Sequence, residues 1–267
     1  MSHIYDALRK AGGEEPKRPQ ESEGASAAAP GTAADGAPRP RGPVAPRGKL
    51  TGRLFAEPDL ELLKELDRLR ASVEVILGPG GRRTIGFVAS GVGEGATTVA
   101  LHFAHLLSRI VESRVLLIDA DCARSNRGLS EAAGERPGLT ELLRGETPLE
   151  EAILATEEPR LHFLPAGRDR IRHIEAATSG RMRPLLEELG GRYDWVVLDI
   201  PAALRHPEGP VVGAGCEGVI LVVRAHRTRR ELVARALEEL NFARCRVLGT
   251  VLNARRESLP GFLRERV

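Results

Sequence analysis

The chain has 267 residues, of which 42% are hydrophobic and 3% aromatic, and its formal net charge is +2. This length suits one globular domain of roughly 200 residues with a tail. The near-neutral charge and the scarcity of aromatic residues argue against a nucleic-acid partner. The three cysteines show no metal-binding or disulfide spacing. No apolar run approaches the roughly 20 residues that cross a bilayer, and the N-terminus has no signal-peptide pattern. We therefore expect a cytoplasmic protein that reaches the inner membrane only through a partner.

The first 49 residues predict two different segments. Residues 1–11 read as a short amphipathic helix in which Ile4, Tyr5 and Leu8 share one stripe. Such a short helix is marginal alone, so it either frays or docks on a partner, and its patterning favours docking. Residues 12–49 are rich in Pro, Ala, Gly, Glu and Arg, which predicts a disordered linker. The remaining residues, 50–267, form the expected globular domain.

A longer helix is predicted at 58–77, where leucines recur three and four residues apart and build one apolar seam. The seam fits packing on the chain's own sheet and fits a subunit contact equally well. The glycine-rich stretch 78–81 ends this helix.

Strands and helices then alternate along the rest of the chain. Apolar runs predict strands at 84–89, 114–118, 161–165, 195–198, 219–224 and 246–253. Helical patterns fall at 97–110, 139–144, 149–155, 182–189 and 228–240. Continuous Val, Ile and Leu runs joined by helices indicate an α/β fold, a parallel sheet with helices on both faces. Ligands of such sheets bind at the carboxyl ends of the strands.

A glycine-rich turn follows the first of these strands, within the stretch TIGFVASGVGEGATTVA at 84–100. A strand, a glycine turn and a helix start are the layout of a phosphate-binding loop, because backbone N–H groups and the helix N-terminus converge on an anion. The candidate loop residues are Gly93, Glu94, Gly95, Ala96, Thr97 and Thr98. The fingerprint ends in Gly-Lys-Thr, so Ala96 stands where the phosphate-binding lysine belongs.

Two further strands end in carboxylates. The run VLLIDAD delivers Asp119 and Asp121, and YDWVVLDIP delivers Asp199. Carboxylates at these strand ends can hold Mg²⁺ beside the Thr97 hydroxyl and orient an attacking oxygen. Each aspartate could instead form a strand-end turn. The presence of the loop in the same chain favours a nucleotide site of the P-loop NTPase type.

These motifs together resemble the bacterial tyrosine autokinases of capsule and exopolysaccharide synthesis, relatives of the MinD/ParA-type P-loop ATPases. The resemblance covers about residues 60–253. It rests on SGVGEGATT, VLLIDADCARS, GLTELLRGE, LHFLPAG, SGRM, YDWVVLDIPA, EGVILVVRAHRT and VLGTVLN. It implies ATP or ADP and Mg²⁺ as cofactors, a membrane chain-length or co-polymerase protein as partner, and a possible homo-oligomer.

The resemblance also implies residue roles. Asp119 and Asp121 match the family's second acidic motif, with candidate catalytic roles, and the loop residues match its phosphate loop. Thr97 and Asp199 match the Mg²⁺-linked positions. Asn253 lies where relatives contact the adenine base, although a strand-end turn residue is an equal interpretation.

The chain departs from the family at several positions. Ala96 replaces the lysine, Ala123 replaces the arginine of the acidic motif, and Asp67 stands where the oligomerisation helix carries an arginine. The family's tyrosine-rich C-terminal tail is absent, and the tyrosines of this sequence are Tyr5 and Tyr193.

We therefore predict a tyrosine-kinase-like nucleotide-binding regulator whose kinase activity is weakened or lost. A displaced arginine could supply the missing charge, and Arg124, Arg224 and Arg227 are the candidates. The alternatives are a non-catalytic scaffold or a MinD/ParA-like positioning ATPase. The latter is disfavoured because Gly91 stands where those ATPases carry a second lysine.

Overall fold

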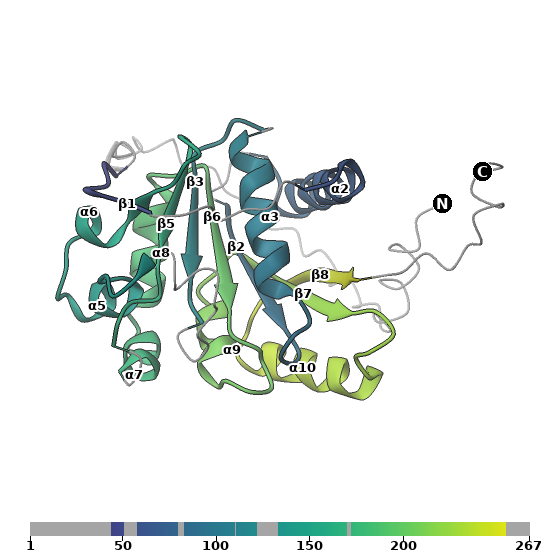
Figure 1. Cartoon of the computed structure of the whole chain (residues 1–267). Coiled ribbons are helices and arrows are strands. Elements are labelled where there is room, and N and C mark those ends of the chain that lie inside the picture. Colours follow the sequence, from purple (N-terminus) through teal and green to yellow (C-terminus); the bar gives the residue numbers. More distant parts are fainter. Residues whose placement is uncertain are drawn as a thin grey trace, which may run out of the picture. The chain divides into compact units, whose positions relative to one another are not determined.

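The structure is a computed structural model that describes residues 44–50, 58–79, 83–109, 111–121, 133–169 and 172–254. The predicted docking helix at 1–11 and the predicted linker up to residue 43 lie outside the described residues, as do Ala123 and Arg124. Figure 1 shows the arrangement of the labelled elements.

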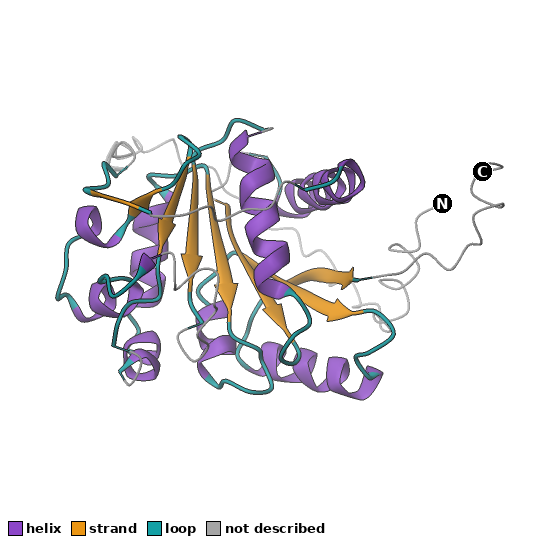
Figure 2. Cartoon of the chain, viewed as in Figure 1, coloured by secondary structure: helices purple, strands orange, loops and turns teal. Residues whose placement is uncertain are grey.

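The described residues form an eight-stranded sheet in the order β1-β4-β5-β3-β6-β2-β7-β8. The strands are β1 (Gly48–Lys49), β2 (Arg83–Ala89), β3 (Val115–Asp119), β4 (Leu154–Ala155), β5 (Leu161–Leu164), β6 (Trp195–Ile200), β7 (Gly218–Arg224) and β8 (Val247–Asn253). Every neighbouring pair is parallel except β4 and β5. The predicted α/β fold with a parallel sheet is therefore confirmed, apart from this one antiparallel pair (Figure 2).

Helices cover both faces of the sheet. They are α2 (Leu60–Leu77), α3 (Ala96–Arg109), α5 (Leu139–Arg144), α6 (Leu149–Ala152), α7 (His173–Thr178), α8 (Met182–Gly190), α9 (Glu208–Gly213) and α10 (Arg230–Phe242). Buried side chains of α2 and α3 belong to one hydrophobic cluster, and those of α5, α7, α8, α9 and α10 belong to a second. The sheet separates the two clusters.

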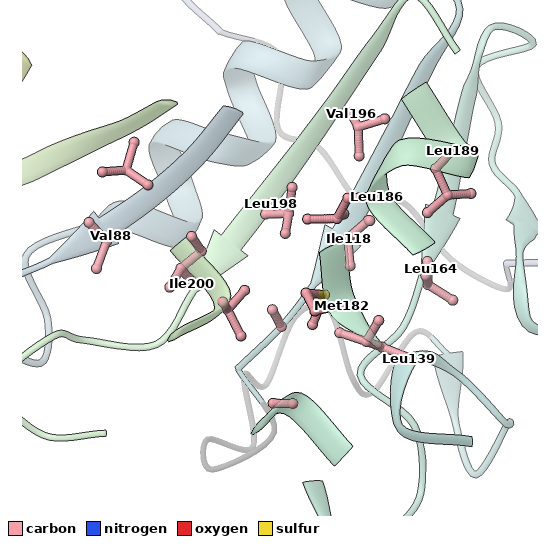
Figure 3. Packing of buried hydrophobic residues seen from close by; sticks show 14 of the residues in the cluster. Val88, Ile118, Leu139, Leu164, Met182, Leu186, Leu189, Val196, Leu198 and Ile200 are labelled. Carbon is pink, nitrogen blue, oxygen red and sulfur yellow. The ribbon is translucent and has the colours of Figure 1, made fainter. Parts of the chain in front are cut away.

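Alternation along the central strands explains the two-sided core. In β6, Val196 and Leu198 face the cluster that contains α8, whereas Trp195 and Val197 face the cluster that contains α3. Successive side chains of a strand point to opposite faces, so a strand covered on both faces must be apolar throughout. Figure 3 shows the first of these layers, in which Met182, Leu186 and Leu189 of α8 lie over strand residues that include Ile118, Val196 and Leu198.

The apolar seam of α2 packs on the chain's own domain. Leu66 and Val73 are buried in the cluster that contains α3. The helix begins behind Asp59, whose carboxylate accepts a 2.7 Å hydrogen bond from Leu62 N, and it ends at Gly78, which has a φ of 82°. On its charged side, Arg70 Nε lies 2.8 Å from Asp67 Oδ1. The seam thus packs against α3 of the same chain. This agrees with the interpretation that the helix packs on its own domain.

The structure differs from the predicted elements mainly at one edge of the sheet. Residues 44–49 were assigned to the linker, but Val44 is buried and Gly48–Lys49 pair in parallel with Leu154–Ala155. The helix predicted at 149–155 is too long, because α6 ends at Ala152 and β4 follows. Helices α7 and α9 were not predicted. Within the described part of the chain, no helix combines the length and apolar character that crossing a bilayer requires.

Candidate nucleotide-binding site

The carboxyl ends of five neighbouring strands, β3, β6, β2, β7 and β8, surround one cavity of about 540 Å³. All six residues of the predicted loop, 93–98, lie in its wall. The cavity is lined by Ala89, Gly91, Gly93, Glu94, Gly95, Ala96, Thr97, Thr98, Leu101, Asp121, Asp199, Ile200, Ala202, Arg224, Asn253 and Ala254. Every predicted site residue is therefore at this cavity except Asp119. Segments far apart in the sequence meet here because their strands are adjacent in the sheet.

The loop between β2 and α3 needs its glycines. Gly93 and Gly95 have φ values of 83° and 97°, a region that residues with a Cβ rarely adopt. A Cβ on Gly95 would also lie only 2.1 Å from Asn253 Nδ2. Helix α3 starts immediately afterwards, with Val99 N donating to Gly95 O at 3.0 Å. The unpaired N–H groups of the first helical turn and the helix dipole make this end of α3 a natural site for phosphate.

Glu94 holds the loop in this conformation. Its carboxylate is buried and accepts hydrogen bonds from Ser90 N (3.0 Å), Ser90 Oγ (2.7 Å) and Thr228 Oγ1 (2.9 Å). A buried carboxylate is stable only when donors of this kind surround it. Glu94 thus links the loop to the β7–α10 connection. It does so although a negative carboxylate repels a phosphate.

Residues at the ends of β7 and β8 also donate hydrogen bonds to the loop backbone. Asn253 Nδ2 donates to Glu94 O at 2.9 Å, and Asn253 Oδ1 accepts from Ala254 N at 2.8 Å. Arg224 Nη1 donates to Gly93 O at 3.1 Å. Both interpretations of Asn253 remain compatible with this geometry, because the residue shapes a strand end and lines the cavity at the same time.

The carboxylates lie on the opposite wall. Asp119 and Asp199 are paired across β3 and β6. Asp119 is fully buried, and its Oδ1 accepts a 3.0 Å hydrogen bond from Asp121 N. Asp121 and Asp199 reach the cavity surface, whereas Asp119 does not line it. Asp119 therefore shapes the turn that presents Asp121. Carboxylate oxygens beside the Thr97 hydroxyl are a donor set that suits Mg²⁺.

A buried histidine supports this turn, and sequence reasoning missed it. His173 of α7 has its Nε2 3.1 Å from Ala120 O and its Nδ1 2.9 Å from Thr140 Oγ1. Because a carbonyl only accepts, the Nε2 must carry a proton. Burial lowers the pKa of His173 below its ordinary value. No local pattern distinguishes this residue, because its two hydrogen-bond partners come from segments far from it in the sequence.

Tyr193 is closed to solvent. It is 4% exposed, and its hydroxyl lies 2.8 Å from His162 Nδ1. Burial raises the pKa of Tyr193 well above its ordinary value, so the phenol stays protonated while it is hydrogen-bonded to the imidazole. A hydroxyl held in this way is not accessible as a phosphate acceptor.

The glycine loop that follows β2 and opens into α3, with carboxylates at the ends of β3 and β6, defines a class of protein. It is the nucleotide-binding class of α/β proteins that carry a phosphate-binding loop. A Mg²⁺-nucleotide fits the residues present, since the glycine-lined turn, the start of α3 and two carboxylates face one cavity.

The chain belongs to the family described as cellulose biosynthesis protein BcsQ, whose model it matches over residues 85–242. It is also similar to the tyrosine-protein kinase CpsD of Streptococcus agalactiae serotype III (strain NEM316). The two are 30% identical over 171 residues, which cover 64% of this chain and 73% of CpsD. The succinoglycan biosynthesis transport protein ExoP of Rhizobium meliloti (strain 1021) is 30% identical over 174 residues, 64% of this chain and 22% of ExoP. These matches confirm the resemblance drawn from the motifs.

Solved structures agree with the fold. The BceF tyrosine kinase domain has a TM-score of 0.62 at 29% identity, covering 72% of this chain and 75% of that domain. The septum site-determining protein MinD of Pyrococcus horikoshii OT3, solved as a complex with Mg-ADP, has a TM-score of 0.53 at 26% identity, covering 67% of this chain and 74% of MinD. The relatives therefore include tyrosine kinase domains and MinD-like nucleotide-binding proteins.

Proposed function

We propose that this chain is a tyrosine-kinase-like nucleotide-binding regulator of exopolysaccharide synthesis and export, and that it binds Mg-ADP or Mg-ATP with little or no kinase activity. The observation that carries the proposal is Ala96. It is the first residue of α3 and lines a cavity in which the other predicted loop residues are in place. The relative named for succinoglycan biosynthesis and the family named for cellulose biosynthesis support the polysaccharide role.

Different residues of the site bind different parts of the nucleotide. The backbone of residues 93–98 and the start of α3 receive the phosphates. Thr97 and Asp199 would supply oxygen ligands for Mg²⁺, which when bound neutralises phosphate charge. Asn253, which donates to Glu94 O, lines the same cavity, and we expect the adenine base to contact it there. We expect Asp121 to orient an acceptor hydroxyl and Asp119 to position it, since Asp119 Oδ1 accepts a 3.0 Å hydrogen bond from Asp121 N.

The missing lysine sets the expected strength of binding. A hydrogen bond to a charged group contributes roughly 1.5–3 kcal/mol, so its loss weakens binding by about 10- to 150-fold. Phosphoryl transfer suffers more, because its catalysis depends almost entirely on placed positive charge. Weak nucleotide binding without efficient turnover is the combination that we expect.

Calorimetric titration with Mg-ADP tests the proposal on the full chain. The Ala96→Lys variant is expected to bind at least about 10-fold more tightly than the wild type. Ala234→Lys, which adds the same charge at an exposed position of α10, is the matched control and should not change the affinity. Failure of both wild type and Ala96→Lys to bind millimolar nucleotide would favour the non-catalytic scaffold.

We further propose that the chain works at the inner membrane through a co-polymerase protein, contacted by residues 1–11. The ExoP relative, a transport protein by name, supports this assignment. Membrane fractionation of the full chain and of a variant without residues 2–11 tests it. The proposal expects the deletion to release the protein from the membrane fraction, and equal distribution of the two proteins would contradict it.

A further inference from the structure

We infer that Arg224 supplies to the nucleotide phosphates the positive charge that Ala96 cannot. This inference rests on the proposed nucleotide-binding function and adds to it the identity of the phosphate-binding cation. Among the described residues that line the cavity, Arg224 carries the only basic side chain. Asp121 and Asp199 on the opposite wall are acidic, so a polyanionic ligand needs a protein cation in addition to Mg²⁺.

The sheet delivers Arg224 to the loop. Strands β2 and β7 are neighbours, and Ala89, the last residue of β2, is paired with Val222. Arg224, the last residue of β7, lies two residues beyond that pair. It is therefore beside the glycine turn that follows β2 rather than beside β2 itself. Its Nη1 donates to Gly93 O at 3.1 Å, which holds the guanidinium against the glycine turn that lines the cavity.

The guanidinium has capacity left after this bond. Arginine carries several N–H donors in a planar fork, and the bond to Gly93 O uses one of them. The remaining donors match phosphate oxygens in a bidentate geometry. Thr228, in the same connection after β7, bonds to Glu94 at 2.9 Å, so the segment that carries Arg224 is attached to the loop at two points. This attachment reduces the entropy lost when the arginine meets a ligand.

The structure separates Arg224 from the nearest alternative. Arg227 is exposed and does not line the cavity, although it is only three residues away. The pair provides a matched comparison, because neutralising either residue changes the net charge of the chain equally. A long-range charge effect would affect binding in both variants, whereas a direct phosphate contact would affect it only in Arg224 variants.

The experiment is a titration of the full chain with Mg-ADP and with adenosine. Arg224→Gln is expected to weaken Mg-ADP binding by roughly 10- to 100-fold and to leave adenosine affinity unchanged, while Arg227→Gln behaves as the wild type. Ala96→Lys should restore Mg-ADP binding in the Arg224→Gln background, and its gain there should exceed its gain in the wild type. Arg224→Met, which keeps the apolar stem, serves as a second neutral variant if the first does not fold.

Several outcomes would overturn the inference. Equal Mg-ADP affinity of Arg224→Gln and Arg227→Gln would exclude a phosphate contact. Parallel loss of Mg-ADP and adenosine would show that Arg224 only maintains the loop through Gly93. If Ala96→Lys binds Mg-ADP and the wild type does not, the site is intact but Arg224 does not replace the lysine. Failure of every variant, Ala96→Lys included, would instead contradict the proposed function.

Discussion

The bond between Thr228 and Glu94 gives the sharpest test of how the loop is held. Thr228→Val replaces the hydroxyl group by a methyl group of nearly the same size. The change leaves the Glu94 carboxylate without its donor from the β7–α10 connection, while the bonds from Ser90 N and Ser90 Oγ remain. The variant therefore removes a single hydrogen bond between the loop and the β7–α10 connection.

The magnitude follows from the burial of the carboxylate. Glu94 is 7% exposed, and a hydrogen bond to a charged group contributes roughly 1.5–3 kcal/mol. Thr228 is only half-buried, so water can replace part of the lost bond, and we expect a loss of about 1–2 kcal/mol in the free energy of unfolding. Mg-ADP affinity should fall as well, because the loop is less firmly held in the conformation that receives phosphate.

Urea unfolding followed by circular dichroism measures the change as a shift of the midpoint at constant slope. Thr250→Val, which makes the same substitution at an exposed position of β8, is the control. A Thr228→Val midpoint that coincides with that of the control would refute the argument that this bond holds the loop.

Three further predictions concern the loop, the core and pH. Gly95→Ala should cost about 1–3 kcal/mol and weaken Mg-ADP binding, because a φ of 97° strains any residue with a Cβ; unchanged affinity in calorimetry would argue against it. Phe103→Ala should cost about 3–5 kcal/mol, because the ring is fully buried, whereas Phe242→Ala, 89% exposed, should be nearly neutral in the same denaturation assay. Burial lowers the pKa of His162, so the unfolded chain binds a proton more readily; stability should therefore hold above about pH 6.5 and fall below it. Tyr193→Phe removes the partner of this imidazole and should lower stability at neutral pH, and a flat pH profile of the wild type would contradict the assignment.

The sequence predicted the strands that are long and apolar, because each is covered on both faces and its pattern records that environment. β3 and β6 are examples, and the same reasoning placed Asp121 and Asp199 at the ends of these strands, where both line the cavity, whereas Asp119 does not line it. The two-residue strands β1 and β4 were not predicted. A pairing this short leaves no periodic pattern in the sequence and depends on the neighbouring strand. Helix α9, with the sequence EGPVVG, reads as a turn in isolation.

The candidate site was predictable in its parts but not in its connections. The resemblance to a known phosphate loop assigned Glu94 to this turn, but its partner Thr228 lies 134 residues away in the sequence. The ranking of Arg224 above Arg227 likewise needed the sheet order, which sequence spacing does not specify. The catalytic, metal-binding and adenine-binding roles stay predictions, and so do the predicted docking helix and the linker up to residue 43.

The hydrogen bond from Asn253 to Glu94 O joins residues 159 positions apart. The final described strand thus closes a cavity whose first wall is built near the start of the domain, and β8 is added at the outer edge of the sheet. During synthesis, the glycine turn can form before β8 leaves the ribosome, but this cavity is incomplete until β8 has joined the sheet. Nucleotide binding would therefore stabilise only those chains in which β8 has already paired with β7.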